Sequence, residues 1–99
     1  MKNRIGYTPT FKKDVKRLKK AHFNLNLMYD AIEHLVQKDT DILISQYRDH
    51  ALKGIWKGYR ELHILADWLL IYKVEKDEIN LVVLDNKRSI LASCFFYLI

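Results

Sequence analysis

The chain has 99 residues, of which 49% are hydrophobic and 29% are charged, and its formal net charge at pH 7 is +5. This length fits one domain with a modest core, and the hydrophobic share excludes intrinsic disorder as the default state. The basic balance favours a polyanionic partner, namely nucleic acid, an acidic protein or an anionic membrane.

Cysteine content and apolar stretches narrow the class further. A single cysteine excludes an internal disulfide framework and a cysteine-based zinc site. The longest uncharged stretch, residues 89–99, is too short to cross a bilayer as a helix. The N-terminus leads into no apolar run of the signal-peptide type. We therefore expect one cytoplasmic domain over residues 1–99, without a membrane partner.

The first half of the chain predicts a short strand at residues 4–7, followed by two helices. Thr8 can cap the first helix, and Pro9 suits its first turn. Three apolar residues then follow at helical spacing: Phe11, Val15 and Leu18. The other face of this helix carries cations: Lys12, Lys13, Lys16, Arg17, Lys19 and Lys20.

The second predicted helix covers residues 25–38, with Asn24 as its cap. Its buried stripe is expected to contain Met28, Ile32 and Leu35, with Ala31 and Val36 beside them. A turn at residues 21–24 would join the two helices as an antiparallel pair.

The second half of the chain predicts strands. Residues 42–47 form a connecting segment or an extra turn, and residues 49–58 form a loop in which Gly54 and Gly58 permit unusual backbone angles. Short β-rich runs follow at residues 59–64, 68–74 and 79–84. The predicted order β-α-α-β-β-β indicates an α+β domain, with two helices packed on one face of a small, mainly antiparallel sheet.

The cations of the first helix have two interpretations that the sequence leaves open. Like charges on one helix repel by about a few tenths of a kcal/mol per badly placed pair, which an anionic partner would relieve. The helix therefore presents either an ordinary solvated face or a contact to phosphates, whose affinity should fall with salt.

The four histidines differ in their surroundings. His22 and His34 are expected to have surface or structural roles, whereas His50 lies among cations and His63 precedes Asp67 by four residues on a predicted strand. A straight strand would separate that pair by about 13 Å, but a turn at residues 64–66 would bring the two side chains to a cross-strand distance of about 5 Å. Two histidines and an aspartate also suit a metal, but the sequence has no tight histidine pair, so we expect none.

These groups fit the chemistry of a ribonuclease that works without a metal. Such an enzyme needs a base for the 2′-hydroxyl, an acid for the leaving 5′-oxygen, and cations for the charge on phosphorus. Histidine suits either proton transfer because its ordinary pKa is about 6.5. Lys53 and Lys57 supply nearby charge for RNA binding, and Trp68 either stacks an unpaired base or packs in the core. Arg60 points away from His63 by strand alternation.

The longest motif of the chain begins at Asp49. It reads DHALKGIWKGYRELH, followed from Asp67 by DWLLIYK. These runs closely resemble the YafQ branch of the RelE/ParE toxin superfamily, whose pattern reads roughly D-H-x-L-x-G-x-W-K-x-x-R-[ED]-x-H and then D-W-[IL]-L-I-Y. The helical half agrees in order and character, including Phe11, Asp14 and Arg17 at intervals of three.

The resemblance implies a RelE-like fold and the toxin of a type II toxin–antitoxin system. Such a toxin is a ribosome-dependent endoribonuclease that enters the A site and cuts mRNA without a metal or another cofactor. Its implied partners are the ribosome, mRNA and an acidic, DinJ-like antitoxin, and it reaches operator DNA only through the antitoxin complex. By motif position the catalytic residues are His50, His63 and Asp67, with Trp68 beside them. His50 and Asp67 would act as base or as charge-orienting groups.

The resemblance breaks at residues 85–99, an atypical apolar tail of the single domain. Family members usually end the last strand with R-x-G-[ST]-H-x-x-L-F, in which the histidine is the expected general acid and the arginine holds the phosphate. Here Asp85 stands at the arginine position and Ser89 at the histidine position. Loss of a general acid costs about 10²–10⁴-fold in rate, and the nearby Lys87 and Arg88 are poor proton donors at neutral pH. We therefore expect weakened or absent cleavage.

Two alternatives follow from this departure. A catalytically inactive homologue would keep the antitoxin or ribosome interface and act as a binding protein. The gyrase-poisoning branch of the superfamily shares the fold, but it lacks the set formed by His50, His63 and Asp67 with their neighbours. The sequence does not reveal the codon preference, the identity of the antitoxin or the stoichiometry of the complex.

Overall fold

The computed structural model describes residues 4–65 and 67–85. Its elements in chain order are β1 (Arg4–Tyr7), α1 (Pro9–Lys20), α2 (Leu25–Val36), α3 (Thr40–Tyr47), β2 (His50–Ala51), a 3₁₀ turn (Gly54–Trp56), β3 (Arg60–Leu65), β4 (Trp68–Glu75) and β5 (Glu78–Asp85). Within these ranges no helix is long and apolar enough to cross a membrane.

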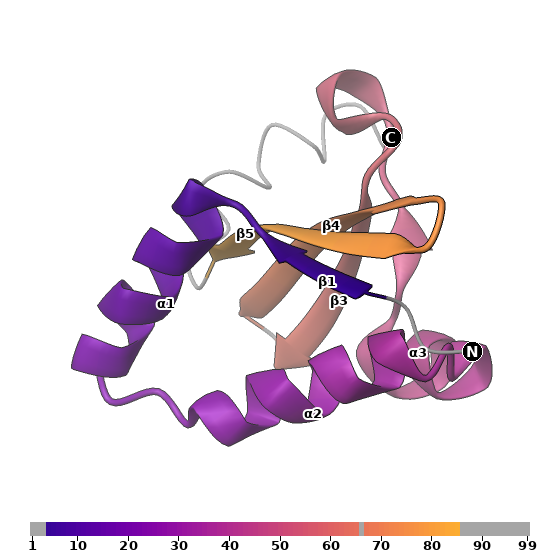
Figure 1. Cartoon of the computed structure of the whole chain (residues 1–99). Helices are drawn as coiled ribbons and strands as arrows, with labels where there is room; N and C mark the ends of the chain where they lie inside the picture. The colour runs from indigo at the N-terminus through magenta and orange to yellow at the C-terminus, as the bar shows by residue number, and fades with distance from the viewer. Residues whose placement is uncertain (1–3, 66, 86–99) are drawn as a thin grey trace.

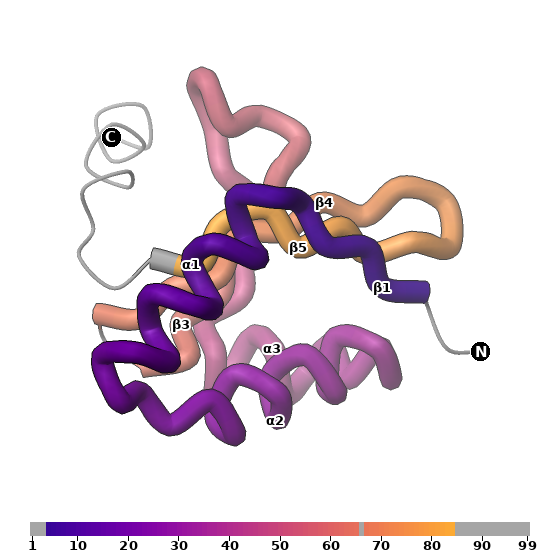
Figure 2. Tube along the Cα trace, turned by 60° about the vertical axis from the view of Figure 1, so that its left-hand side comes forward, coloured from indigo at the N-terminus to yellow at the C-terminus, as the bar shows by residue number. Residues whose placement is uncertain are grey.

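The strands form one five-stranded sheet in the order β1-β5-β4-β3-β2. The first strand runs parallel to β5, and every other neighbouring pair is antiparallel. Figures 1 and 2 show the sheet with α1 and α2 on one side of it. The predicted α+β class with a mainly antiparallel sheet is confirmed.

The helices begin where the sequence predicts. The Thr8 side chain accepts a hydrogen bond from the Phe11 N–H at 3.1 Å, and the Asn24 side chain accepts one from the Asn26 N–H at 3.1 Å. The second helix ends at Val36, earlier than predicted, and Lys38 beyond it adopts a left-handed conformation with φ of 59°. A non-glycine residue in this region does not continue a helix.

The predicted antiparallel helix pair is wrong. Figures 1 and 2 show α1 and α2 lying crosswise on either side of their connecting turn, rather than side by side. The first helix is tied to the sheet instead, because Asp14 accepts a hydrogen bond from the Leu84 N–H at 3.0 Å and Arg17 donates one to the Leu84 carbonyl at 3.3 Å. These two residues of the family motif thus hold α1 against β5.

Two elements lie where the sequence indicated only connecting segments. Residues 40–47 form the helix α3, and residues 50–51 form the short edge strand β2 inside the predicted loop. Gly54 and Gly58 do have positive φ values, 65° and 95°. The described part of the domain therefore contains three helices rather than the two we predicted.

Alternation along the strands gives the sheet two apolar faces. On β4, Trp68, Leu70 and Tyr72 belong to the main core, which includes Phe11, Leu18, Met28, Ala31, Leu35 and Leu43 from the helices. Leu69 and Ile71 point to the opposite face, where they pack in a smaller cluster with Leu52, Val83, Trp56 and Tyr59. This second face lies away from α1, α2 and α3 and carries the candidate site.

Candidate active site

The candidate site is built on the two neighbouring strands β2 and β3. Their antiparallel register pairs His50 with Glu61, and His63 follows Glu61 by two residues on the same face of β3. Their neighbours Leu62 and Ile64 lie in the main core, so Glu61 and His63 point away from the helices. The pairing therefore brings together two histidines that are 13 residues apart in the sequence.

Glu61 joins the two histidines. Its Oε1 atom lies 3.2 Å from His63 Nε2 and 3.5 Å from His50 Nε2, and the two imidazole centroids are 6.1 Å apart. The Glu61 side chain is only 3% exposed, whereas those of His63 and His50 are 20% and 37% exposed. A buried carboxylate needs hydrogen-bond or charged partners. The two imidazoles supply them whenever their Nε2 atoms carry protons.

The tautomer of His50 follows from its second contact. His50 Nδ1 lies 2.7 Å from the carbonyl oxygen of Arg48. A carbonyl oxygen only accepts, so Nδ1 carries the proton and Nε2 is the nitrogen that can gain or lose one. This exchangeable nitrogen faces Glu61.

The same three residues could hold a metal ion. Among the described residues, one ligand atom from each of His50, Glu61 and His63 lies within 4.8 Å of the other two. Two imidazole nitrogens with one carboxylate oxygen form a donor set that first-row transition metals accept. Sequence spacing contains no such signal, because the three residues become neighbours only through the β2–β3 pairing.

The other predicted catalytic residue, Asp67, is placed differently from our expectation. We expected a turn at residues 64–66 that sets Asp67 opposite His63, but Leu65 pairs with Trp68 and His63 pairs with Leu69. Asp67 lies in the turn itself and is exposed. The turn is therefore shorter than the three residues we expected. A bulge between His63 and Leu65 shifts the strand register at this end of the hairpin, so Asp67 does not face His63.

The predicted RNA contacts divide into two groups. Lys53 and Lys57 are exposed on either side of the 3₁₀ turn. Trp68, in contrast, is 2% exposed and belongs to the main core, where its ring meets that of Phe23 edge-on at 5.2 Å. This burial does not suit the predicted base stacking and fits the alternative role in the core.

A second polar cluster lies beside the site, on the helix-facing side of the sheet. The Asp49 carboxylate accepts hydrogen bonds from Arg60 Nη2 at 2.9 Å and Nε at 3.2 Å, and from the Tyr72 hydroxyl. Burial, together with the hydrogen bond and charge of Asp49, raises the pKa of Tyr72 above its ordinary value. The predicted orientation of Arg60 away from His63 is thus confirmed.

Glu61, Asp49 and Tyr72 were absent from the predicted site. The two-residue strand period would have placed Glu61 on the His63 face, but nothing in the sequence shows that the short segment at residues 50–51 is a strand beside it. The predictions for the Asp85 side chain and for Lys87, Arg88 and Ser89 lie outside what the structure describes.

The comparisons with known proteins agree with this fold. A profile of the family described as "Bacterial toxin of type II toxin-antitoxin system, YafQ" matches residues 3–90. The mRNA interferase toxin YafQ of Escherichia coli K12 is 41% identical over 70 residues, which cover 71% of this chain and 75% of that protein.

Several solved structures are similar over most of the chain, including the following two. YafQ in the E. coli DinJ–YafQ toxin–antitoxin complex aligns with a TM-score of 0.78 and 33% identity, covering 92% of this chain and 98% of that one. A copper-bound mutant toxin from Helicobacter pylori aligns with a TM-score of 0.76 and 34% identity, covering 85% and 93%. The fold and these similarities define a bacterial toxin of the type II toxin–antitoxin class, and the chain belongs to the YafQ family within it.

Proposed function

We propose that this chain is an endoribonuclease toxin that cleaves mRNA at the ribosome by metal-free acid–base chemistry. The observation that carries the proposal is the His50–Glu61–His63 cluster, which sets two imidazoles on one buried carboxylate. The E. coli relative that is 41% identical is named an mRNA interferase. Because its substrate is mRNA under translation, we place the protein in the cytoplasm.

The proposed reaction uses the 2′-hydroxyl of the RNA as nucleophile. His50 Nε2 takes the hydroxyl proton, the 2′-oxygen bonds to phosphorus, and the bond from phosphorus to the 5′-oxygen breaks. Glu61 stabilises the imidazolium that His50 becomes, because a charged pair in a partly buried site is worth more than one in water. Lys53 and Lys57 offset the charge on the phosphate, and Asp67 at the turn helps to orient the substrate or a histidine.

The acid step is where we propose that activity is impaired. The leaving 5′-oxygen needs a proton, and Ser89 occupies the position at which the family has its histidine. His63 or water must supply the proton instead. The missing arginine at position 85 further weakens the hold on the phosphate. These two changes also favour the alternative function, an inactive homologue that binds antitoxin or ribosome.

Primer extension on cellular mRNA after induction tests the proposed cleavage. We expect cuts within translated codons, weaker than those of E. coli YafQ and absent in His50→Ala. The double variant Asp85→Arg with Ser89→His should increase cleavage by roughly ten-fold or more, since general acid catalysis contributes about 10²–10⁴-fold. No cuts in either form would refute nuclease activity and favour the binding function.

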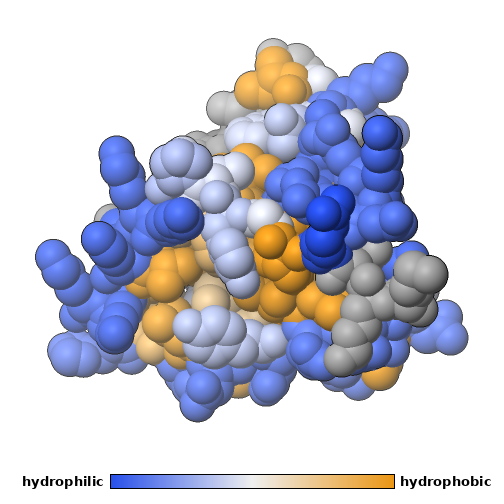
Figure 3. Space-filling model, viewed as in Figure 1, coloured by the Kyte–Doolittle hydropathy of each residue, from blue (hydrophilic) through white to orange (hydrophobic). Residues whose placement is uncertain are grey.

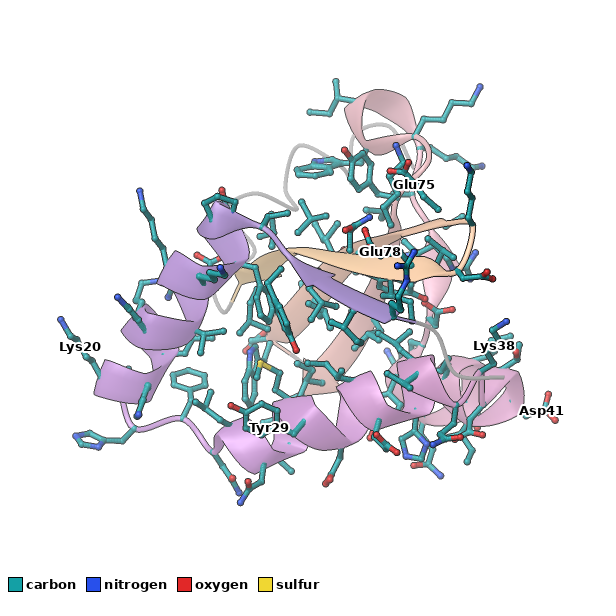
Figure 4. All side chains as sticks on the ribbon, in the orientation of Figure 1. Lys20, Tyr29, Lys38, Asp41, Glu75 and Glu78 are labelled. Carbon is teal, nitrogen blue, oxygen red and sulfur yellow. The ribbon has the colours of Figure 1, made fainter. Side chains whose placement is uncertain are left out.

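We further propose an acidic, DinJ-like antitoxin as the protein partner, with operator DNA bound only through the complex. An apolar groove of about 390 Å³ lies between α1 and α2, lined by Tyr7, Phe11, Lys12, Val15, Lys16, Met28, Tyr29 and Ile32. Figure 3 shows apolar surface here beside the hydrophilic side chains of α1, and Figure 4 shows Lys20 pointing outward from the end of that helix. Within the described residues no carboxylate lies within 4.0 Å of Lys12 or Lys16.

Calorimetry with purified E. coli DinJ tests this surface. We expect the reversal of charge in Lys12→Glu with Lys16→Glu to weaken binding and to reduce its salt dependence. Lys38→Glu, beyond the far end of α2, is the control for a charge reversal outside the groove and should bind as the unaltered chain does. A Lys12→Glu, Lys16→Glu variant that binds DinJ as tightly as Lys38→Glu and the unaltered chain do would refute a role for the groove.

A further inference from the structure

One peptide unit connects helix α3 to the imidazole of His50. The Asp49 N–H donates to the Leu43 carbonyl at 3.0 Å, and the Arg48 carbonyl accepts from His50 Nδ1 at 2.7 Å. This N–H and this carbonyl belong to the same peptide bond, and in a trans peptide they point in opposite directions. The hydrogen bond to α3 is therefore one of the contacts that orient the Arg48 carbonyl, and this carbonyl selects which imidazole nitrogen of His50 keeps its proton.

The Asp49 side chain holds this peptide in place from the other side. It is 7% exposed, and its Oδ2 atom takes both Arg60 hydrogen bonds while its Oδ1 atom takes the one from Tyr72. The two donors come from β3 and β4, two neighbouring interior strands of the sheet. Removing one partner of a buried charge pair leaves the other charge uncompensated. A displacement of the Asp49 side chain would therefore cost free energy, and its contacts fix the position of residue 49.

The backbone at Arg48 ends α3 in the left-handed conformation that commonly terminates helices. Arg48 has a φ of 52° in the left-handed region, which is uncommon for a residue with a side chain. Such a conformation persists when neighbouring contacts determine it. Here the contacts are the hydrogen bonds on either side of the Arg48–Asp49 peptide.

We propose that Asp49 is a positioning residue for the reaction of His50. Its buried contacts with Arg60 and Tyr72 hold the Arg48 carbonyl against His50 Nδ1, which keeps the proton on Nδ1 and leaves Nε2, the atom that faces Glu61, to exchange the reacting proton. The catalytic part of this inference rests on the proposed function, but the control of the tautomer does not.

Nitrogen-15 NMR of the histidine side chains tests the inference directly. At a pH at which the imidazoles are neutral, we expect His50 in the unaltered chain to be the Nδ1–H tautomer. In Asp49→Asn we expect a mixture of both tautomers at His50, with the signals of His34, which contacts Asp39, unchanged. An unchanged His50 tautomer in folded Asp49→Asn would overturn the proposal.

Asp39→Asn is the matched control. Asp39 is a carboxylate whose Oδ2 atom lies 2.9 Å from His34 Nδ1, so its loss should alter the His34 signals and leave those of His50 as they were. If Asp49→Asn does not fold, Tyr72→Phe removes one of the hydrogen bonds to Asp49 and keeps the ring in the core. A smaller change of the His50 tautomer in Tyr72→Phe then supports the proposal, and no change overturns it.

Cleavage of mRNA on programmed ribosomes gives the functional readout. We expect Asp49→Asn to lower kcat by roughly ten-fold or more, as other tautomer-setting carboxylates do, while KM stays within about two-fold because Asp49 does not face the substrate side of the sheet. A raised KM with unchanged kcat would refute positioning. Absence of cleavage by the unaltered chain would refute the proposed function, and the NMR result would still decide the role of Asp49.

Discussion

Glu61→Gln is the substitution that most directly probes the proposed chemistry. The amide has nearly the same shape as the carboxylate, but it lacks the negative charge that lies 3.2 Å from His63 Nε2 and 3.5 Å from His50 Nε2. An imidazolium that forms during the reaction then loses its counter-charge. The fold should persist, because an amide still offers hydrogen-bonding atoms in this buried position.

The size of the effect can be bounded from these distances. Coulomb's law at an effective dielectric constant of ~20 gives roughly 5 kcal/mol for unit charges ~3.5 Å apart, which is an upper limit. Hydrogen bonds to charged groups contribute about 1.5–3 kcal/mol net. Since each ~1.4 kcal/mol changes a rate ten-fold, we expect Glu61→Gln to slow cleavage by about 10- to 100-fold.

Single-turnover cleavage on programmed ribosomes, with toxin in excess, resolves slow rates and is the suitable assay. Glu75→Gln provides the control, because the exposed Glu75 carboxylate lies 3.5 Å from Lys73 Nζ on the far part of β4, away from both histidines. We expect its rate to equal that of the unaltered chain. A folded Glu61→Gln protein that cleaves at the unaltered rate would refute the role we assign to the buried carboxylate.

Three further predictions concern the core, the pH dependence and metal binding. Trp68→Ala should lower the free energy of unfolding by about 3–5 kcal/mol in chemical denaturation, because the ring is in the core; a stable variant with weakened RNA binding would support stacking instead. The raised pKa of Tyr72 stabilises the fold below pH 10.0, the ordinary tyrosine value, and this contribution is lost as pH rises beyond it. The melting temperature of Tyr72→Phe should therefore be lower than that of the unaltered chain at pH ~8, and the two should converge above pH ~10. A difference in melting temperature that does not change with pH would contradict the role of the Tyr72 hydroxyl. Copper(II) should raise the melting temperature through the His50–Glu61–His63 cluster; an equal rise in His63→Ala would locate the metal elsewhere.

Local signals in the sequence were sufficient for much of the fold. Thr8 and Asn24 cap their helices as predicted because a cap depends on residues two or three positions away. The three long strands were likewise predictable from their β-branched and aromatic content. The crossing of α1 and α2 was not, because it depends on the distant hydrogen bonds of Asp14 and Arg17 with Leu84.

The candidate site was predictable only in part, for a related reason. The motif identified His50 and His63, and the structure brings them together. The position of Asp67 depended on which residues form the β3–β4 turn, and a shift of strand register moves a side chain away from its expected partner. Glu61 and Asp49 gain their roles through pairings with β2, β3 and β4, which no short sequence window contains.

The parallel pairing of β1 with β5 gives this domain a particular order of assembly. Arg4 aligns with Glu78, so the first strand has no partner strand until β5, residues 78–85, has been synthesised. The hairpins that carry His50, Glu61 and His63 close over short loops and can form earlier. The pairing of β1 with β5 closes the long segment between Arg4 and Glu78, which costs more chain entropy. The sheet of this toxin therefore gains its first strand last, and a chain interrupted before Glu78 would leave β1 without its neighbour.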